Sequence, residues 1–153
     1  ASAWGCEVTA FSSSPSKFDE ARGFGAHHVV SSRDSAAIRS LAGTLDLVLV
    51  TVNVSLDWSA LIATLKPRGR LHVVGAVLEP IPVQAFDLII AQRSISGSPT
   101  GSPSVIAKML DFAARHTIAP QIERFPMSKI NAAFDHLRNG KARYRIVLDA
   151  DWK

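Results

Sequence analysis

The chain has 153 residues, of which 47% are hydrophobic and 20% charged, so it can bury a core and belongs to neither the disordered nor the fibrous class. The net charge of +4 comes from scattered Lys and Arg without interleaved aromatic residues, and we expect no nucleic-acid partner. No apolar run approaches a membrane span and residues 1–5 lack signal-peptide features, so we expect no membrane partner and a cytoplasmic location. The single cysteine, Cys6, excludes an intramolecular disulfide and a cysteine-cluster zinc site.

The chain is organised around residues 6–17, where a β-prone run stops in three serines and a proline. This pattern predicts a strand, a short polar loop and the start of a helix. Serine hydroxyls and free N–H groups at a helix start can bind an anion, and Lys17 in the first turn opposes the helix dipole unless an anion is present. Two interpretations stay open: a phosphate-binding loop, or a capped helix with a solvated lysine. In dinucleotide-binding units an acid near this point recognises a ribose 2′-hydroxyl, whereas a basic residue accommodates a 2′-phosphate, and residues 11–16 contain no acid.

The next stretch alternates helix and strand. We expect a helix over residues 15–22, a strand over 27–30, and a second helix that Asp34 or Ser35 caps and Gly43 ends. Neighbouring residues of a strand point to opposite faces, so His27 and His28 are not expected to chelate one metal ion together.

Residues 45–52 form a nearly unbroken apolar run, which is typical of a parallel strand covered on both faces. A helix with Trp58, Leu61, Ile62 and Leu65 on one face follows, and then a strand over residues 71–75. This rhythm predicts an α/β fold with a doubly wound parallel sheet. Its ligand-binding loops would lie at the carboxyl ends of the strands, at residues 12–14, 51–53 and 75–77. Gly75 either lets backbone approach a ligand or merely ends a strand.

The remaining elements continue the alternation. We expect a short helix over residues 86–92 and a strand over 94–98. Ser102 then caps a helix that starts at Pro103 and carries a buried apolar stripe. A strand over 121–125, a helix from Ser128 to Gly140 and a last strand over 144–148 complete the pattern.

Several short motifs stand in this order and spacing: residues 8–14 with Lys17, 25–30, 65–71, 74–75, 95–98 and 142–147. With them the chain resembles the medium-chain zinc-dependent alcohol dehydrogenases, most closely their NADP-preferring branch similar to cinnamyl alcohol dehydrogenases. The resemblance implies a Rossmann-like doubly wound sheet, truncated at its N-terminus, in residues 1–101. Residues 102–153 would be the returning C-terminal α+β segment of the substrate domain.

The resemblance also implies cofactor-binding residues for NADP. The 2′-phosphate would be held by Ser12, Ser13, Ser14 and Lys17. The path from adenosine to nicotinamide would include Thr51, Gly75, Ala76, Val77 and Ser98, and Arg145 would approach the pyrophosphate. No catalytic residue and no metal ligand is expected in this chain.

The departures from the family pattern concern what would precede residue 6. Neither the first strand nor its G-x-G-x-x-G turn is present, and residues 1–5 would correspond to the end of the first helix. The missing strand would lie between the strand ending at Phe11 and the one beginning at Leu45, leaving both neighbouring edges unpaired. The family's zinc ligands would lie upstream, so zinc is expected in the parent enzyme only.

The function that the resemblance implies is hydride transfer between NADP(H) and an alcohol or aldehyde by the parent enzyme, with this fragment alone inactive. The parent would form a homodimer through the strand at residues 94–98. Two alternatives stay open: a zinc-free NADPH-dependent enzyme of the quinone-reductase type, and a non-catalytic nucleotide-binding or interaction domain.

Overall fold

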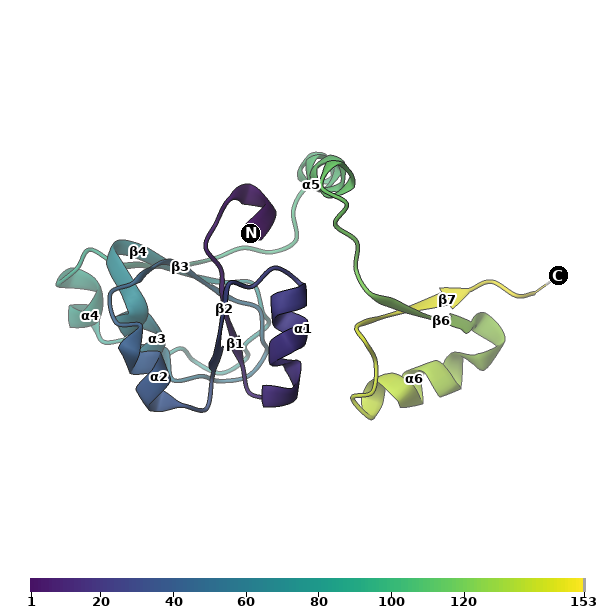
Figure 1. The fold of residues 1–153 in the computed structure, drawn as a ribbon, viewed down its shortest axis with the longest axis horizontal. Helices are drawn as coiled ribbons and strands as arrows, with labels where there is room; N and C mark the ends of the chain where they lie inside the picture. Colours follow the sequence, from purple (N-terminus) through teal and green to yellow (C-terminus); the bar gives the residue numbers. More distant parts are fainter. Residues whose placement is uncertain (153) are drawn as a thin grey trace. The chain divides into compact units, whose positions relative to one another are not determined.

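The computed structural model describes residues 1–152 of the chain, which divides into two compact units, Ala1–Gly101 and Ser102–Lys153 (Figure 1). Each unit combines helices with strands, and every strand pair is parallel. The predicted α/β class with parallel sheets is therefore confirmed. The two units are described separately below.

The first unit alternates strands and helices as the sequence predicts. Two of its helices begin at side-chain caps: the Asp34 carboxylate accepts the Ala36 and Ala37 N–H groups, and the Asp57 carboxylate accepts that of Ala60. In chain order the elements are η1 (Ser2–Trp4), β1 (Thr9–Ser12), η2 (Pro15–Lys17), α1 (Phe18–Gly23), β2 (His28–Ser31), α2 (Ser35–Ser40), β3 (Leu45–Val50), α3 (Trp58–Thr64), β4 (Leu65–Val73), α4 (Ala85–Ile89) and β5 (Ser94–Gly97).

The strands of the first unit form two sheets, with orders β1-β2 and β3-β4-β5. Within residues 1–152, β1 pairs only with β2 and β3 pairs only with β4. One edge of β1 and one edge of β3 are thus unpaired within the described residues.

The core of the first unit lies between α3 and one face of the β3-β4-β5 sheet. Leu65 and Leu71 are fully buried there, together with Val48, Val50, Trp58, Leu61 and Ile62. The opposite face is open, because Leu47 and Leu49 of β3 are 55% and 54% exposed. The expectation that this strand is covered on both faces is wrong in the structure, since α3 covers only one of them.

The second unit contains α5 (Pro103–Arg115), β6 (Ile122–Pro126), η3 (Met127–Lys129), α6 (Ile130–Arg138) and β7 (Arg145–Asp149), with β6 parallel to β7. The Ser102 hydroxyl accepts the Val105 N–H at 3.4 Å, and Pro103 occupies the first helical position, so the predicted start of α5 is confirmed. The predicted buried stripe is not found, because no residue of α5 is buried and Val105 and Leu110 are more than half exposed.

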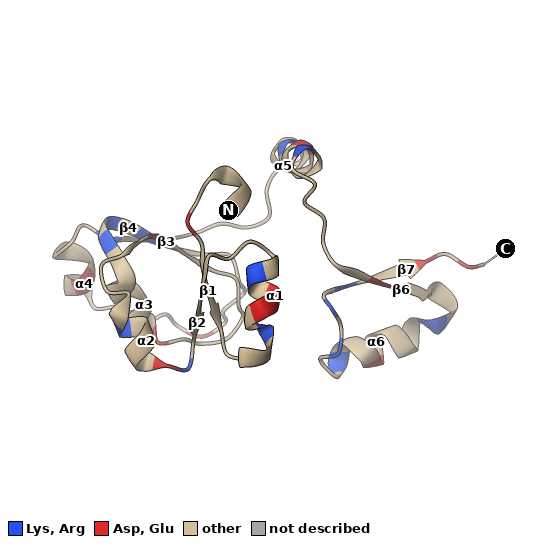
Figure 2. Ribbon diagram, viewed as in Figure 1, with Lys and Arg blue, Asp and Glu red and all other residues tan. Residues whose placement is uncertain are grey.

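Acidic and basic residues are interspersed along the ribbon of both units (Figure 2). In the second unit the Arg124 guanidinium donates to both Asp149 carboxylate oxygens and lowers the pKa of that carboxyl group. The Ser128 hydroxyl and N–H donate to Asp151 and lower its pKa in the same way. No helix within residues 1–152 is long and apolar enough to cross a membrane.

Candidate functional site at the carboxyl ends of the strands

Most of the predicted site residues lie at the carboxyl ends of the strands of the first unit. Ser12 is the last residue of β1, Thr51 directly follows β3, and Ser98 directly follows β5. Because the strands within each sheet are parallel, the loops that follow β3, β4 and β5 leave the same edge of that sheet. The loop after β4 carries Gly75, Ala76 and Val77. Arg145 is the exception, since it begins β7 in the second unit.

Residues 12–17, which begin at the last residue of β1, are connected by hydrogen bonds among their own serines. The Ser12 hydroxyl accepts the Ser14 N–H at 3.3 Å and donates to the Ser14 carbonyl oxygen at 3.2 Å. The Ser14 and Ser16 hydroxyls are 2.8 Å apart. Ser13 and Lys17 are exposed, and Lys17 ends the 3-10 turn η2 instead of lying inside an α-helix. The segment thus has an exposed serine and an exposed lysine on a locally fixed backbone.

The nearest acids in the sequence follow this segment in α1, and one of them pairs with a basic side chain. Asp19 and Glu20 lie in the first turn of α1, and the Asp19 carboxylate accepts from the Arg22 guanidinium at 2.7 Å. Residues 11–18 contain no carboxylate. The chemistry of the donors therefore fits an anionic group better than a neutral hydroxyl.

The structure shows why position 75 needs a glycine, which the sequence alone did not reveal. A Cβ atom at this position would lie 1.9 Å from the carbonyl oxygen of Val52, and the Gly75 N–H donates to the Val50 carbonyl at 3.0 Å. The glycine therefore brings together the loops that follow β3 and β4, a role that was not considered from the sequence. Val77 closes the turn by donating its N–H to the Gly75 carbonyl at 2.9 Å.

We expect Gly75→Ala to destabilise the first unit by about 2 kcal/mol or more, because its methyl group would meet main-chain atoms that cannot rotate away. Urea unfolding measures the change in free energy. Gly23→Ala is the matched control, since no atom lies within 4 Å of a Cβ at Gly23. Equal stability of the two variants would contradict the proposed packing.

Ser98, directly after β5, makes one main-chain and one side-chain hydrogen bond. Its N–H donates to the Val73 carbonyl at 3.2 Å, and its hydroxyl is 2.9 Å from Nε2 of His72. The other ring nitrogen of His72, Nδ1, is 2.8 Å from the Ser96 hydroxyl. His72 was not among the predicted site residues. Its contact depends on the β4–β5 register, which pairs His72 with Ser96 and which the local sequence does not reveal.

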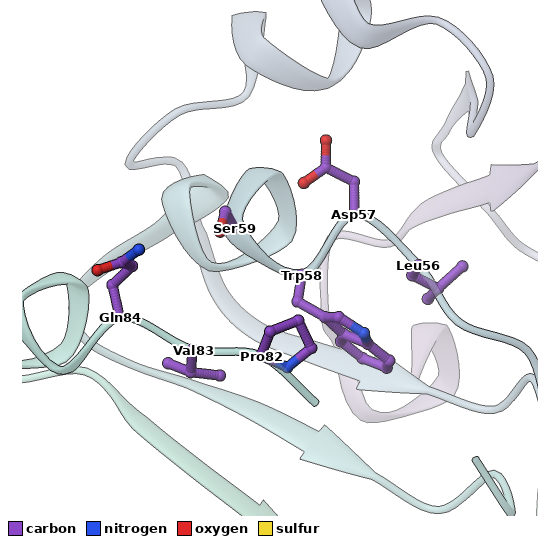
Figure 3. A pocket seen from close by; sticks show the side chains of 7 residues that line it. All are labelled: Leu56, Asp57, Trp58, Ser59, Pro82, Val83 and Gln84. Atoms are coloured by element: carbon purple, nitrogen blue, oxygen red, sulfur yellow. The ribbon is translucent and has the colours of Figure 1, made fainter. Parts of the chain in front are cut away.

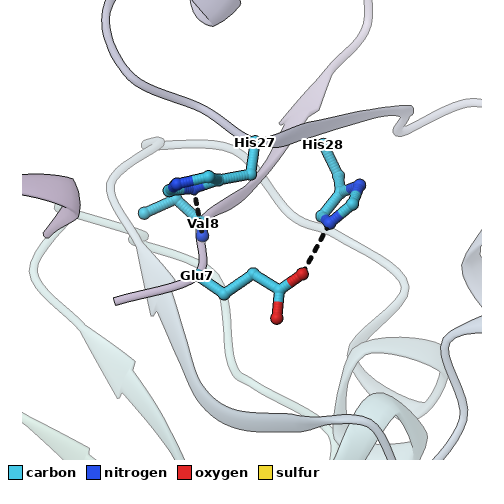
Figure 4. Close-up of polar contacts among 4 residues, drawn as sticks. All are labelled: Glu7, Val8, His27 and His28. Carbon is cyan, nitrogen blue, oxygen red and sulfur yellow. Dashed lines mark hydrogen bonds and ion pairs between the residues drawn. The ribbon is translucent and has the colours of Figure 1, made fainter. Parts of the chain in front are cut away.

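His27 and His28 face different partners (Figure 4). Nδ1 of His27 accepts the Val8 N–H at 3.0 Å, whereas Nε2 of His28 lies 2.7 Å from the Glu7 carboxylate. The hydrogen bond with His28 and the electrostatic attraction of its ring lower the pKa of Glu7. Residues 1–152 contain no group of three or more His, Cys, Asp or Glu side chains arranged to hold a metal ion, so none of them is assigned to zinc.

An open pocket of about 440 Å³ lies beside the start of α3 (Figure 3). Within it Trp58 is 2% exposed, and its indole Nε1 has no hydrogen-bond partner. None of the predicted cofactor residues lines this pocket. The lining residues are Leu56, Asp57, Trp58, Ser59, Pro82, Val83 and Gln84.

Comparison with known proteins identifies the family of this chain. The family model for zinc-binding dehydrogenases matches residues 1–115. The chain belongs to the zinc-binding dehydrogenase family. It is 53% identical over 146 residues to an aldehyde reductase, AdhA, of Synechocystis sp., covering 95% of this chain and 44% of that protein. A probable formaldehyde dehydrogenase of Bacillus subtilis is 40% identical, with 97% of this chain and 43% of that protein covered.

The solved structures agree with this membership of the zinc-binding dehydrogenases. A cinnamyl alcohol dehydrogenase of Sorghum bicolor superimposes with a TM-score of 0.88 at 38% identity, covering 97% of this chain and 42% of that one. A Helicobacter pylori enzyme of the same type, described as complexed with NADP(H), has a TM-score of 0.79 at 29% identity, with the same shares covered. The predicted Rossmann-like class is therefore confirmed. The chain spans less than half the length of the curated relatives it matches.

Proposed function

We propose that this chain is the cofactor-binding part of an NADP-dependent zinc-type alcohol dehydrogenase. The complete enzyme would transfer hydride between NADP(H) and an alcohol or aldehyde, in the cytoplasm. Three findings support this: the family membership, the relatives named as an aldehyde reductase and a formaldehyde dehydrogenase, and the structural neighbour described with NADP(H). The observation that carries the choice of NADP is the acid-free segment of serines and Lys17 at the end of β1.

Residues 1–101 would bind the cofactor and residues 102–153 would belong to the substrate domain. Ser12, Ser13, Ser14 and Lys17 would hold the 2′-phosphate by charge-assisted hydrogen bonds. The loops after β3, β4 and β5 would line the cofactor path through Thr51, Gly75, Ala76, Val77 and Ser98, and Arg145 would approach the pyrophosphate. The bound cofactor supplies the hydride chemistry. Zinc is proposed for the complete enzyme only, with ligands outside this chain.

The test is a titration of the chain with NADPH and with NADH, followed by nicotinamide fluorescence. We expect NADPH to bind at least tenfold more tightly than NADH, because only NADPH carries the 2′-phosphate. Tighter binding of NADH would contradict the choice of NADP. Binding of neither dinucleotide would contradict a cofactor-binding role for this chain and would favour an interaction domain.

We also propose that the complete enzyme forms a homodimer through β5. This strand pairs with β4 on one side, and within residues 1–152 its other edge is unpaired. An unpaired strand edge is a template for pairing with a second chain. Two β5 strands related by a twofold axis would join two sheets into one.

Ile95→Pro is expected to convert such a dimer into a monomer, because proline cannot donate to a strand ladder. Light scattering coupled to size-exclusion chromatography measures the mass. Ile95→Val is the control, since it keeps the N–H and most of the packing of Ile95 against the core. A dimer that survives Ile95→Pro with its fold intact would place the interface elsewhere.

A further inference from the structure

His72 lies on the open face of the β3-β4-β5 sheet, in the row that pairs Leu49 of β3 with His72 and His72 with Ser96 of β5. Its imidazole ring is half-buried and contacts two serines, one in β5 and one directly after it. Nδ1 lies 2.8 Å from the Ser96 hydroxyl, and Nε2 lies 2.9 Å from the hydroxyl of Ser98. The ring therefore connects the body of the sheet to the first residue after β5.

The two contacts restrict the Ser98 hydroxyl in direction as well as position. A neutral imidazole carries one N–H donor and one acceptor nitrogen, whereas a hydroxyl can donate once and accept twice. If Nε2 accepts, the Ser98 O–H points to His72 and the oxygen lone pairs remain for another partner. If Nε2 donates, the Ser98 O–H remains for that partner. In either tautomer the side chain of Ser98 is held in one rotamer, and the Ser98 N–H is fixed by the Val73 carbonyl.

We propose that His72 is a positioning residue that presents the Ser98 hydroxyl to a polar group of the bound dinucleotide. The inference rests on the proposed function, because Ser98 is one of the residues assigned to the cofactor path. It adds a residue that does not itself touch the cofactor. Holding a side chain in its bound conformation before binding increases affinity, because less conformational freedom is lost in the complex.

The ring geometry allows a test with matched variants. An Asn side chain can place its amide near Nδ1 of the histidine it replaces, and a Gln side chain can reach the place of Nε2. His72→Gln therefore keeps a partner for Ser98, whereas His72→Asn keeps a partner for Ser96 only. Both variants remove the ring, so a difference between them does not come from the loss of the ring, and their thermal midpoints show whether the extra methylene of Gln changes packing.

The measurement is the Kd of NADPH for the chain, with the thermal midpoint as a check of folding. We expect His72→Asn and Ser98→Ala each to weaken binding about three- to tenfold, the range for a lost neutral hydrogen bond. His72→Gln and Ser96→Ala should remain within about twofold of the original chain. Adding His72→Asn to Ser98→Ala should cause no further loss, because His72 then has no Ser98 hydroxyl to position.

Equal Kd values for His72→Gln and His72→Asn would overturn the proposal, as would additive losses in the double variant. These outcomes are distinct from a failure of the proposed function. If the unaltered chain binds neither NADPH nor NADH, the cofactor assignment fails and the role of His72 fails with it. If the unaltered chain binds NADPH and the two His72 variants do not differ, only the role of His72 is overturned.

Discussion

Replacing Ser12 with Asp and Lys17 with Ala is expected to invert cofactor preference from NADP(H) to NAD(H). A 2′-phosphate carries close to two negative charges at neutral pH, and hydrogen bonds to charged groups contribute about 1.5 to 3 kcal/mol each. Losing Lys17 alone should thus weaken NADP binding about tenfold or more. A carboxylate at position 12 repels the phosphate and accepts from a ribose 2′-hydroxyl. It can also accept the Ser14 N–H that the Ser12 hydroxyl now accepts, so the segment should keep its shape.

The measurement is the ratio of the Kd values of NADPH and NADH before and after the change, or the ratio of kcat/KM where the complete enzyme is used. Adenosine 2′,5′-bisphosphate against 5′-AMP provides a second ratio that depends on the adenosine half alone. Lys66→Ala is the control for net charge, because Lys66 lies near the start of β4 and pairs with Asp46 at 2.8 Å. If the unaltered protein prefers NAD, the serines and Lys17 only start a helix, which is the other interpretation that the sequence left open.

The features predicted best from the sequence are those decided within a few residues. Asp34 and Ser102 cap helices because each side-chain oxygen reaches an N–H two or three residues ahead. The parallel strands follow from the alternation of apolar runs with helical patterns, and Ser12, Thr51 and Ser98 lie at strand ends because the strand boundaries can be estimated.

Contacts between distant residues could not be predicted in the same way. The contacts of His72 require the register between β4 and β5, and the need for glycine at position 75 arises from the approach of the Val52 carbonyl in the loop after β3. Burial on both faces of β3 was predicted from its apolar run. A run of apolar residues indicates that a surface can be covered, but it does not indicate what covers it.

The second prediction with a large effect is a loss of stability on truncating a leucine in the core of the first unit. Leu71 lies in β4, the central strand of the β3-β4-β5 sheet, is fully buried, and packs with Trp58 and Ile62 of α3 in the same cluster. Leu71→Ala should lower the free energy of unfolding by about 3 to 4 kcal/mol, because it leaves a cavity that a β-strand between two others cannot close. Urea unfolding measures the loss against the original chain. Since domains of this size are stable by about 5 to 15 kcal/mol, the variant should lose a large part of its stability.

Leu49→Ala is the matched control, because it makes the same change in the neighbouring strand on the open face of the same sheet. Leu49 is 54% exposed, so we expect a loss of about 1 kcal/mol or less, from the smaller apolar area removed from water. The comparison also tests whether that face is open in solution. If Leu49→Ala costs as much as Leu71→Ala, a further surface covers the face in solution, and the two-sided burial expected from the apolar run of β3 holds there. If Leu49→Ala costs little while Leu71→Ala costs several kcal/mol, the stability of this unit comes from the α3 side of the sheet alone.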